Sequence, residues 1–160
     1  MPVGIMQVLN NLNVPLGYRN VESELFFIIQ PPTSENRKDR LLATSKSVDD
    51  TLPWYNPDDD TRHIWLLWGN GSLRLSEHNA QFRFDYQVNK TWHSKSVGKL
   101  SNGARYVLKF DPYEKTQGGL GVEITIFRYK DLFRTIGTHI SRDLLEQLDT
   151  VVDQIFLPVE

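Results

Sequence analysis

Residues Gln81–Val88 read QFRFDYQV, and apolar and polar side chains alternate along this stretch without a break. Because successive side chains of a β-strand point to opposite sides, the apolar ones share one face: Phe82, Phe84, Tyr86 and Val88. The polar ones share the other face: Arg83, Asp85 and Gln87. The pattern therefore predicts a strand with one side in a hydrophobic core and the other in water.

Segments of the same kind lie on both sides of this strand and are separated by turn residues. We expect further strands at Ser23–Gln30, His63–Trp68, Ser72–Ser76, Thr91–Leu100, Arg105–Phe110 and Gly121–Tyr129. The triplet Ser101-Asn102-Gly103 predicts a tight hairpin, because an Asn-Gly pair accepts the positive φ that a type I′ turn needs. Since most connections are short, we expect about seven strands paired in an antiparallel sheet.

The end of the chain has helical spacing instead. The stretch Gly137–Ile155 reads GTHISRDLLEQLDTVVDQI, in which Ser141 suits a helix N-cap and Asp143 suits the positive end of the helix dipole. The apolar residues form one stripe on such a helix: Leu144, Leu145, Leu148, Val151, Val152, Ile155 and Phe156. We therefore expect an α+β fold, mainly β: an antiparallel sheet of about seven strands with a C-terminal amphipathic helix packed on it.

The chain of 160 residues has the length of one compact domain, within which two parts differ in composition. Residues 1–61 are expected to hold an N-terminal strand followed by a long polar loop, because residues 31–61 are rich in Pro, Ser, Asp and Asn. Residues 1–20 could form a short helix or an extended arm. Residues 62–160 are expected to hold the antiparallel sheet and its closing helix.

Composition excludes several classes of protein. The chain has no cysteine, so it contains neither disulfides nor thiolate metal sites. No apolar run approaches the roughly 18 residues of a membrane span, and the first residues lack the basic head and apolar stretch of a signal peptide. We expect an intracellular protein, cytoplasmic or nuclear and not secreted, and its compactness suits a viral protein.

Motifs for catalysis or cofactor binding are missing from the sequence. The four histidines lack the paired spacing of metal ligands: His63, His78, His93 and His139. The glycines at 118–121 precede a predicted strand rather than a helix, and they lack the Lys-Ser/Thr of a phosphate loop. We expect no enzymatic activity, no metal and no cofactor.

Charge and aromatic residues gather in one region of the chain. Residues 81–140 hold ten Lys/Arg and five Asp/Glu, although the net charge of the whole chain is −2. The same region holds ten of the 18 aromatic residues. Interleaved cations and aromatic rings on strands are typical of proteins that bind single-stranded nucleic acid. Alternating aromatics on strands are equally typical of a hydrophobic core, so the pattern leaves both interpretations open.

Part of this region resembles a known family. The resemblance lies in four segments that follow one another along the chain: Val97-Gly98-Lys99, Arg105-Tyr106-Val107, Val122–Ile126 with Arg128-Tyr129, and the apolar spacing of Gly137–Ile155. Residues 96–156 thereby resemble the single-stranded-DNA-binding domain of the transcriptional positive cofactor four family, related to Whirly-type proteins. The resemblance implies a four-stranded antiparallel sheet with one closing helix, a homodimer or higher homo-oligomer joined by those helices, and a nucleic-acid channel.

The chain departs from the family pattern in two places. The loop from Asp111 to Gly119 is longer than the family's tight basic turn, and Leu132–Ile136 replaces a basic stretch before the helix. These departures weaken the transfer of DNA contacts to this chain. The resemblance covers about 60 of the 160 residues.

The leading hypothesis is a non-enzymatic protein that binds single-stranded DNA or RNA. The candidate phosphate-binding residues are Lys95, Lys99, Arg105, Lys109, Lys115, Arg128, Lys130 and Arg134. The candidate stacking residues are Trp92, Phe110, Tyr113 and Tyr129. One alternative is a viral structural, matrix-like or interaction protein that uses the 31–61 loop, with Trp54-Tyr55, as its contact surface. A further alternative is a small-ligand β-barrel closed by the helix.

Overall fold

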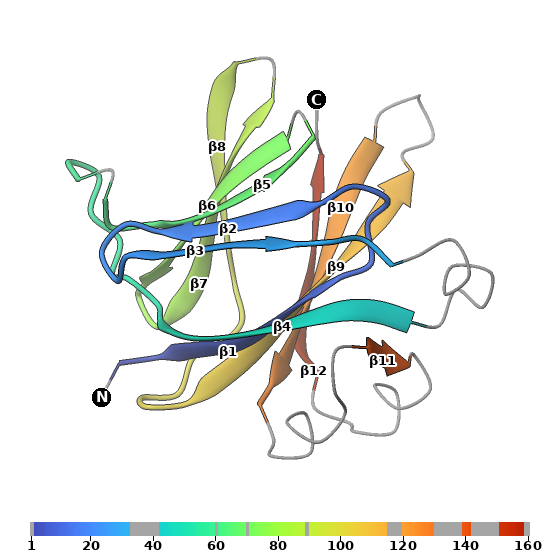
Figure 1. Cartoon of the computed structure of the whole chain (residues 1–160). Helices are drawn as coiled ribbons and strands as arrows, with labels where there is room; N and C mark the ends of the chain where they lie inside the picture. The colour runs from blue at the N-terminus through green and yellow to red at the C-terminus, as the bar shows by residue number, and fades with distance from the viewer. Residues whose placement is uncertain are drawn as a thin grey trace.

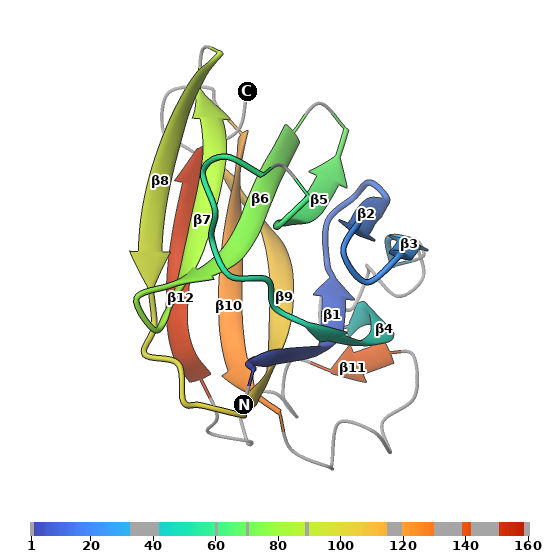
Figure 2. The same cartoon turned by 90° about the vertical axis from the view of Figure 1, so that its left-hand side faces the viewer.

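The protein is all-β in the part of the chain that the structure describes. The computed structural model describes residues 2–32, 42–59, 61–69, 71–88, 90–114, 120–129, 139–141 and 151–158. These residues form twelve strands in two six-stranded sheets. The sheets stack face to face as two layers (Figures 1 and 2), so the hydrophobic core lies between them.

One sheet is mixed and takes its strands from both ends of the chain. Its order is β11 (His139–Ser141), β4 (Leu42–Thr51), β1 (Gly4–Asn10), β9 (Arg105–Glu114), β10 (Leu120–Arg128) and β12 (Val151–Pro158). Neighbours are antiparallel except β1 and β9, which run parallel. The N-terminal strand β1 therefore lies in the middle of this mixed sheet.

The other sheet is antiparallel throughout. Its order is β3 (Leu25–Ile29), β2 (Leu16–Asn20), β5 (Ile64–Trp68), β6 (Gly71–His78), β7 (Gln81–Val88) and β8 (Thr91–Val97). Figure 2 shows this antiparallel sheet curving from β8 to β3 beside the strands of the mixed sheet. Neighbouring strands follow one another along the chain, except that β2 pairs with β5.

The alternating stretch QFRFDYQV is confirmed as strand β7, with its apolar side in the core. Phe82 and Phe84 are fully buried, and the Phe82 ring meets the Tyr106 ring of β9 edge-to-face at 5.3 Å between centroids. Such aromatic pairs favour an edge-to-face arrangement, because the positive ring edge meets the negative ring face. Strand β7 is thereby held against the mixed sheet.

A buried polar cluster joins the two sheets at their other side. The hydroxyl of Tyr18 on β2 donates to Asp50 Oδ2 on β4 at 2.6 Å, and Asn20 Nδ2 donates to the same oxygen at 2.8 Å. The backbone N–H of Thr51 donates to Asp50 Oδ1 at 2.8 Å. Burial raises the pKa of Tyr18, and the neighbouring Asp50 carboxylate raises it further. Asp50 is buried, but both of its oxygens have hydrogen-bond donors.

The predicted C-terminal helix is wrong wherever the structure describes that segment. Residues 151–158 form strand β12, which pairs antiparallel with β10, and residues 139–141 form β11. Of the predicted stripe, Val151, Val152, Ile155 and Phe156 lie on β12, and Leu144, Leu145 and Leu148 lie outside the described residues. Because β12 buries Ile155 and Leu157 but exposes Gln154 and Phe156, its burial alternates with the period of two that a strand has.

The physical reason is competition between local spacing and strand pairing. The segment Val151–Ile155 contains three β-branched residues, which suit strands, and β10 offers it a ladder of backbone hydrogen bonds. Tertiary pairing therefore outweighs the helical spacing. The helix seam expected for a homodimer has no counterpart in the described residues.

Three other expectations are corrected. The predicted polar loop of residues 31–61 contains the ten-residue strand β4, and residues 1–20 form β1 and β2 rather than a helix. The turn at Ser101–Ala104 forms, with Gly103 at φ 77°, but it is no hairpin. It carries the chain from β8 in the antiparallel sheet to β9 in the mixed sheet. The strands expected to form one four-stranded unit with a closing helix are thus divided between two sheets.

Candidate functional site

Within the described residues, the cations singled out from the sequence that lie on strands are divided between the two sheets. Lys95 on β8 donates from Nζ to the backbone oxygen of Phe156 at 3.2 Å, which ties β8 to β12. Lys109 pairs with Asp111 at 3.2 Å, and the Arg105 guanidinium lies 5.4 Å from the centre of the Tyr129 ring. Two further cations are exposed, namely Lys99 and Arg128, and three lie outside the described residues, namely Lys115, Lys130 and Arg134.

The predicted stacking residues differ in their exposure. Phe110 is fully buried between the sheets and has no face for a base to stack on. Tyr113 packs against Phe156 at 4.9 Å between ring centroids, and Tyr129 lies beneath Arg105. Trp92 on β8 is exposed. Of the four predicted stacking residues, Trp92 is the one that lies on an exposed surface.

That surface is the outer face of the antiparallel sheet, the side turned away from the mixed sheet. One row of directly paired residues crosses all six strands of this face: Phe26, Arg19, Trp65, Arg74, Asp85 and Ser94. Because side chains alternate along a strand, the inward neighbours Ile64, Leu66, Leu73 and Leu75 are buried in the core. The row therefore places aromatic and arginine side chains next to one another on one surface.

Arg74 and two tryptophans form the centre of this outer face. The Arg74 guanidinium carbon lies 3.8 Å from the centre of the Trp92 ring and 5.7 Å from that of Trp65. The two indoles meet edge-to-face at 6.4 Å. An arginine over the face of an indole makes a cation–π contact, which is favourable because the ring face is electron-rich. The three side chains come from β5, β6 and β8, which only the folded sheet brings together.

A second arginine lies at the same face beside Tyr55. The Arg83 guanidinium carbon is 3.7 Å from the centre of the Tyr55 ring, and Arg83 Nε pairs with Asp85 Oδ1 at 3.1 Å. Tyr55 also stacks on His78 at 5.0 Å. Tyr55 is therefore packed against the sheet, whereas its neighbour Trp54 is 68% exposed.

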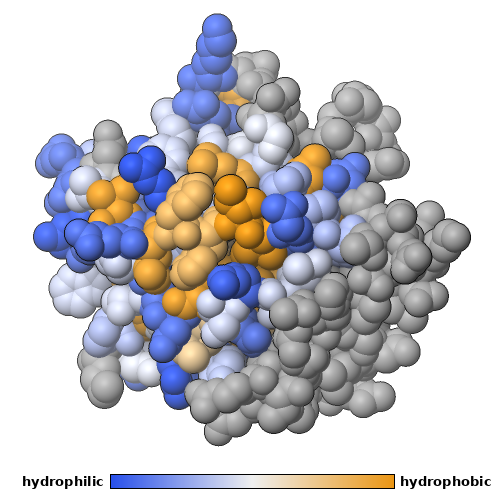
Figure 3. Space-filling model, in the orientation of Figure 1, coloured by the Kyte–Doolittle hydropathy of each residue, from blue (hydrophilic) through white to orange (hydrophobic). Residues whose placement is uncertain are grey.

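Apolar side chains extend the outer face toward β3. Phe26 is 60% exposed and Ile28 56%, and Leu67 and Trp92 are each 39% exposed. Figure 3 shows a hydrophobic area in the middle of the surface, over the region where β2 and β3 lie in Figure 1. Exposed apolar patches on folded domains mark surfaces that bind proteins, membranes or ligands.

The sequence contained a signal for this face that charge counting passed over. Arg19 and Arg74 lie in residues 1–80, which hold seven Lys/Arg against ten Asp/Glu and so look acidic as a whole. The apolar/polar alternation used for Gln81–Val88 also applies to Gly71–His78, where it puts Arg74 on the side opposite Leu73 and Leu75. Counting charge by strand face, rather than by sequence region, would therefore have singled out Arg74.

No family model, curated protein or solved structure matches this chain. None of the described residues belongs to a helix long and apolar enough to cross a membrane. Within the same residues, no three His, Asp or Glu side chains gather as metal ligands would. Function is therefore inferred from the chemistry of the outer face.

Proposed function

We propose that this protein binds single-stranded nucleic acid, DNA or RNA, on the outer face of its antiparallel sheet, without catalysing a reaction. The proposal rests on one contact: the Arg74 guanidinium carbon lies 3.8 Å from the centre of the exposed Trp92 ring, so a cation and an aromatic ring lie side by side. Arginine and tryptophan side by side on an open strand face are the groups that bind the backbone and the bases of an unpaired strand.

Each kind of group on the face has a role in such binding. Arg19, Arg74 and Arg83 supply cations for phosphates. Asp85, the one acid in the row that contains Arg19 and Arg74, is buried and paired with Arg83. The exposed rings of Phe26 and Trp92 supply surfaces for bases, each stack contributing about 1–3 kcal/mol. A duplex would hide its base faces, so these rings favour single strands.

A second candidate function is protein binding on the same face. The aliphatic side chains of Ile28 and Leu67 are exposed beside Phe26, and aliphatic groups contribute little to stacking on bases. They would instead suit the apolar centre of a protein interface. The two candidates differ in their salt dependence, because nucleic-acid binding releases counterions and apolar contact does not.

The test is fluorescence anisotropy of short labelled oligothymidylate and oligouridylate at increasing salt. We expect binding at low salt that weakens steeply as salt rises. Trp92→Leu should weaken binding by about 5- to 150-fold, which corresponds to the loss of one stack of about 1–3 kcal/mol. Arg74→Gln should also weaken binding. Its matched control is Arg128→Gln, which removes one exposed cation from β10 in the mixed sheet.

Two outcomes would overturn the proposal. One is the absence of any binding to either oligonucleotide at low salt. The other is equal loss of affinity in Arg74→Gln and Arg128→Gln, because this would mean that overall charge, and not the outer face, governs binding. Salt-independent capture of a protein by the outer face, with no oligonucleotide binding, would favour the second candidate.

A further inference from the structure

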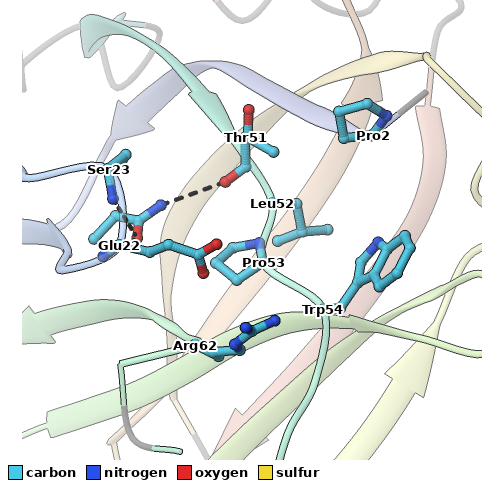
Figure 4. A pocket seen from close by; sticks show the side chains of 9 residues that line it. Pro2, Glu22, Ser23, Thr51, Leu52, Pro53, Trp54 and Arg62 are labelled. Atoms are coloured by element: carbon cyan, nitrogen blue, oxygen red, sulfur yellow. Dashed lines mark hydrogen bonds between the residues drawn. The ribbon is translucent and has the colours of Figure 1, made fainter.

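A pocket opens beside Trp54, apart from the row of residues on the outer face. It has a volume of about 410 Å³ and lies where the turn between β2 and β3, the end of β4, residues 52–54 and Arg62 meet. Its lining includes Glu22, Ser23, Thr51, Trp54 and Arg62. Figure 4 shows Trp54 on one side of this space, with the side chains of Glu22 and Arg62 across from it.

The backbone holds Trp54 firmly at the rim. Trp54 forms a β-bridge with Glu77, and the residues on each side of it bond to the Glu77 backbone: Tyr55 N–H donates to Glu77 O, and Glu77 N–H to Pro53 O, both at 2.8 Å. Leu52 N–H donates to Val3 O at 2.9 Å, and the Leu52 side chain is buried. The indole is thus exposed on an anchored segment and not on a loose one.

Two charged side chains of opposite sign face the pocket, and neighbouring groups position both. Asn20 Oδ1 accepts hydrogen bonds from the backbone N–H groups of Glu22 and Ser23, at 3.1 and 3.4 Å, which fixes the turn that carries Glu22. Arg62 Nε pairs with Asp59 at 3.4 Å. Hydrogen bonds from Thr61 hold the pKa of Asp59 below its usual range, so this partner stays ionised.

We propose that this pocket binds a sugar ring, as a free glycoside or as one unit of an oligosaccharide. Sugar hydroxyls both donate and accept hydrogen bonds, so they can donate to the Glu22 carboxylate and accept from the Arg62 guanidinium. The C–H face of a pyranose carries partial positive charge and fits the negative face of the Trp54 indole. The pocket volume lies in the range of small-ligand sites.

Charge separates this site from the nucleic-acid surface proposed above. The groups around the pocket include the carboxylates of Glu22 and Asp59, and Arg62 is already paired with Asp59. A phosphate would be repelled by Glu22, whereas an uncharged sugar would not. The proposal is independent of nucleic-acid binding and goes beyond it.

The test is a tryptophan-fluorescence titration of the full chain with neutral methyl glycosides of glucose, galactose, mannose and N-acetylglucosamine, and with short oligomers of each. We expect at least one sugar to change the emission saturably. Trp54→Ala and Glu22→Gln should each weaken binding by tenfold or more, measured for Trp54→Ala by ligand-observed NMR. Trp54→Phe, which keeps an aromatic face, should retain part of the affinity.

Trp92→Leu serves as the control, because it removes an exposed tryptophan that does not line this pocket, and it should leave sugar binding unchanged. Trp54→Ala should in turn leave oligonucleotide binding unchanged, so that failure of either proposal can be recognised separately. The sugar proposal is overturned if no sugar gives a saturable change, or if Trp54→Ala binds as tightly as the wild type. Tighter binding of glycine or lysine than of every sugar would also overturn the proposal, because Glu22 and Arg62 would then bind a zwitterion.

Discussion

Replacing Tyr18 with phenylalanine removes a single hydroxyl from the buried cluster that joins the two sheets. In the wild type this hydroxyl donates to Asp50 Oδ2 at 2.6 Å, and the Tyr18 side chain is fully buried. The ring remains in Tyr18→Phe, so the packing of β2 against β4 should be kept. The variant therefore isolates the hydrogen bond.

The expected cost at neutral pH follows from the partners that remain. A hydrogen bond to a charged group contributes about 1.5–3 kcal/mol to stability. After the substitution, Asp50 Oδ2 still accepts from Asn20 at 2.8 Å, and its other oxygen still accepts from Thr51. Because the carboxylate is not left without donors, the lower end of this range is expected, about 1.5–2 kcal/mol.

The pH dependence of stability gives a second and sharper magnitude. The folded protein raises the pKa of Tyr18 above its ordinary value of 10.0. Below pH 10 both folded and unfolded chains keep the proton, so the stabilisation is fully present. Above pH 10 only the unfolded chain loses it, and stability should fall by about 1.4 kcal/mol per pH unit from this residue alone. Tyr18→Phe should lack this component.

The assay is urea denaturation of both proteins at pH 7 and at several values above pH 10. The wild type should be more stable at pH 7, and the difference should shrink as the pH rises. Tyr113→Phe, which removes a hydroxyl from a partly exposed ring, is the control for the neutral-pH comparison. Parallel stability curves for wild type and Tyr18→Phe above pH 10 would refute the reasoning, because Tyr18 would then ionise equally in both states.

Three further substitutions test the surface and the core. Arg74→Gln should reduce the slope of log affinity against log salt for single-stranded DNA by about 0.7, whereas Arg128→Gln should change neither the slope nor the affinity; equal slopes for all three proteins would contradict the assigned surface. Phe82→Ala should lower the free energy of unfolding by about 3–5 kcal/mol in urea, since the side chain is fully buried, and a loss below about 1 kcal/mol would count against its place in the core. Gly121→Ala should destabilise the protein by about 1–3 kcal/mol, because the added Cβ would lie 2.8 Å from a backbone oxygen of β12. In the control Gly17→Ala, the nearest contact of the added Cβ is 3.6 Å, so stability should change by less than about 0.5 kcal/mol. Similar thermal midpoints for the two variants would contradict the pairing of β10 with β12.

Many of the strands could be predicted because the periodicity of apolar residues within each segment indicates a strand. The strands predicted at Ser23–Gln30, His63–Trp68, Gln81–Val88 and Gly121–Tyr129 all overlap observed strands. Each has alternating or continuous apolar residues between turn signals, and that pattern depends only on near neighbours. Strand β4 was missed because its sequence, LATSKSVDDT, is mostly polar and hydrophobic periodicity is weak in it.

The candidate site could be predicted much less well than the strands. Counting cations by sequence region selected residues 81–140, but the outer face combines Arg19 from β2 with Arg74 from β6 and Trp92 from β8. Which strands neighbour one another depends on long-range pairing, which no short window of sequence specifies. The prediction for Phe110 failed for the same reason: its ring was expected to stack on a base, but long-range packing buries it.

The sequence by itself determined which side chains share a strand face, because backbone geometry forces the alternation in Gln81–Val88 wherever that strand lies. It also determined the positive-φ turn at Gly103, which glycine adopts without steric cost. Only the tertiary structure decided that residues 151–158 extend along β10 rather than coil, and that Arg74 meets Trp92. Both depend on hydrogen-bond partners and contacts distant along the chain, whose free energy exceeds the local preference of the segment.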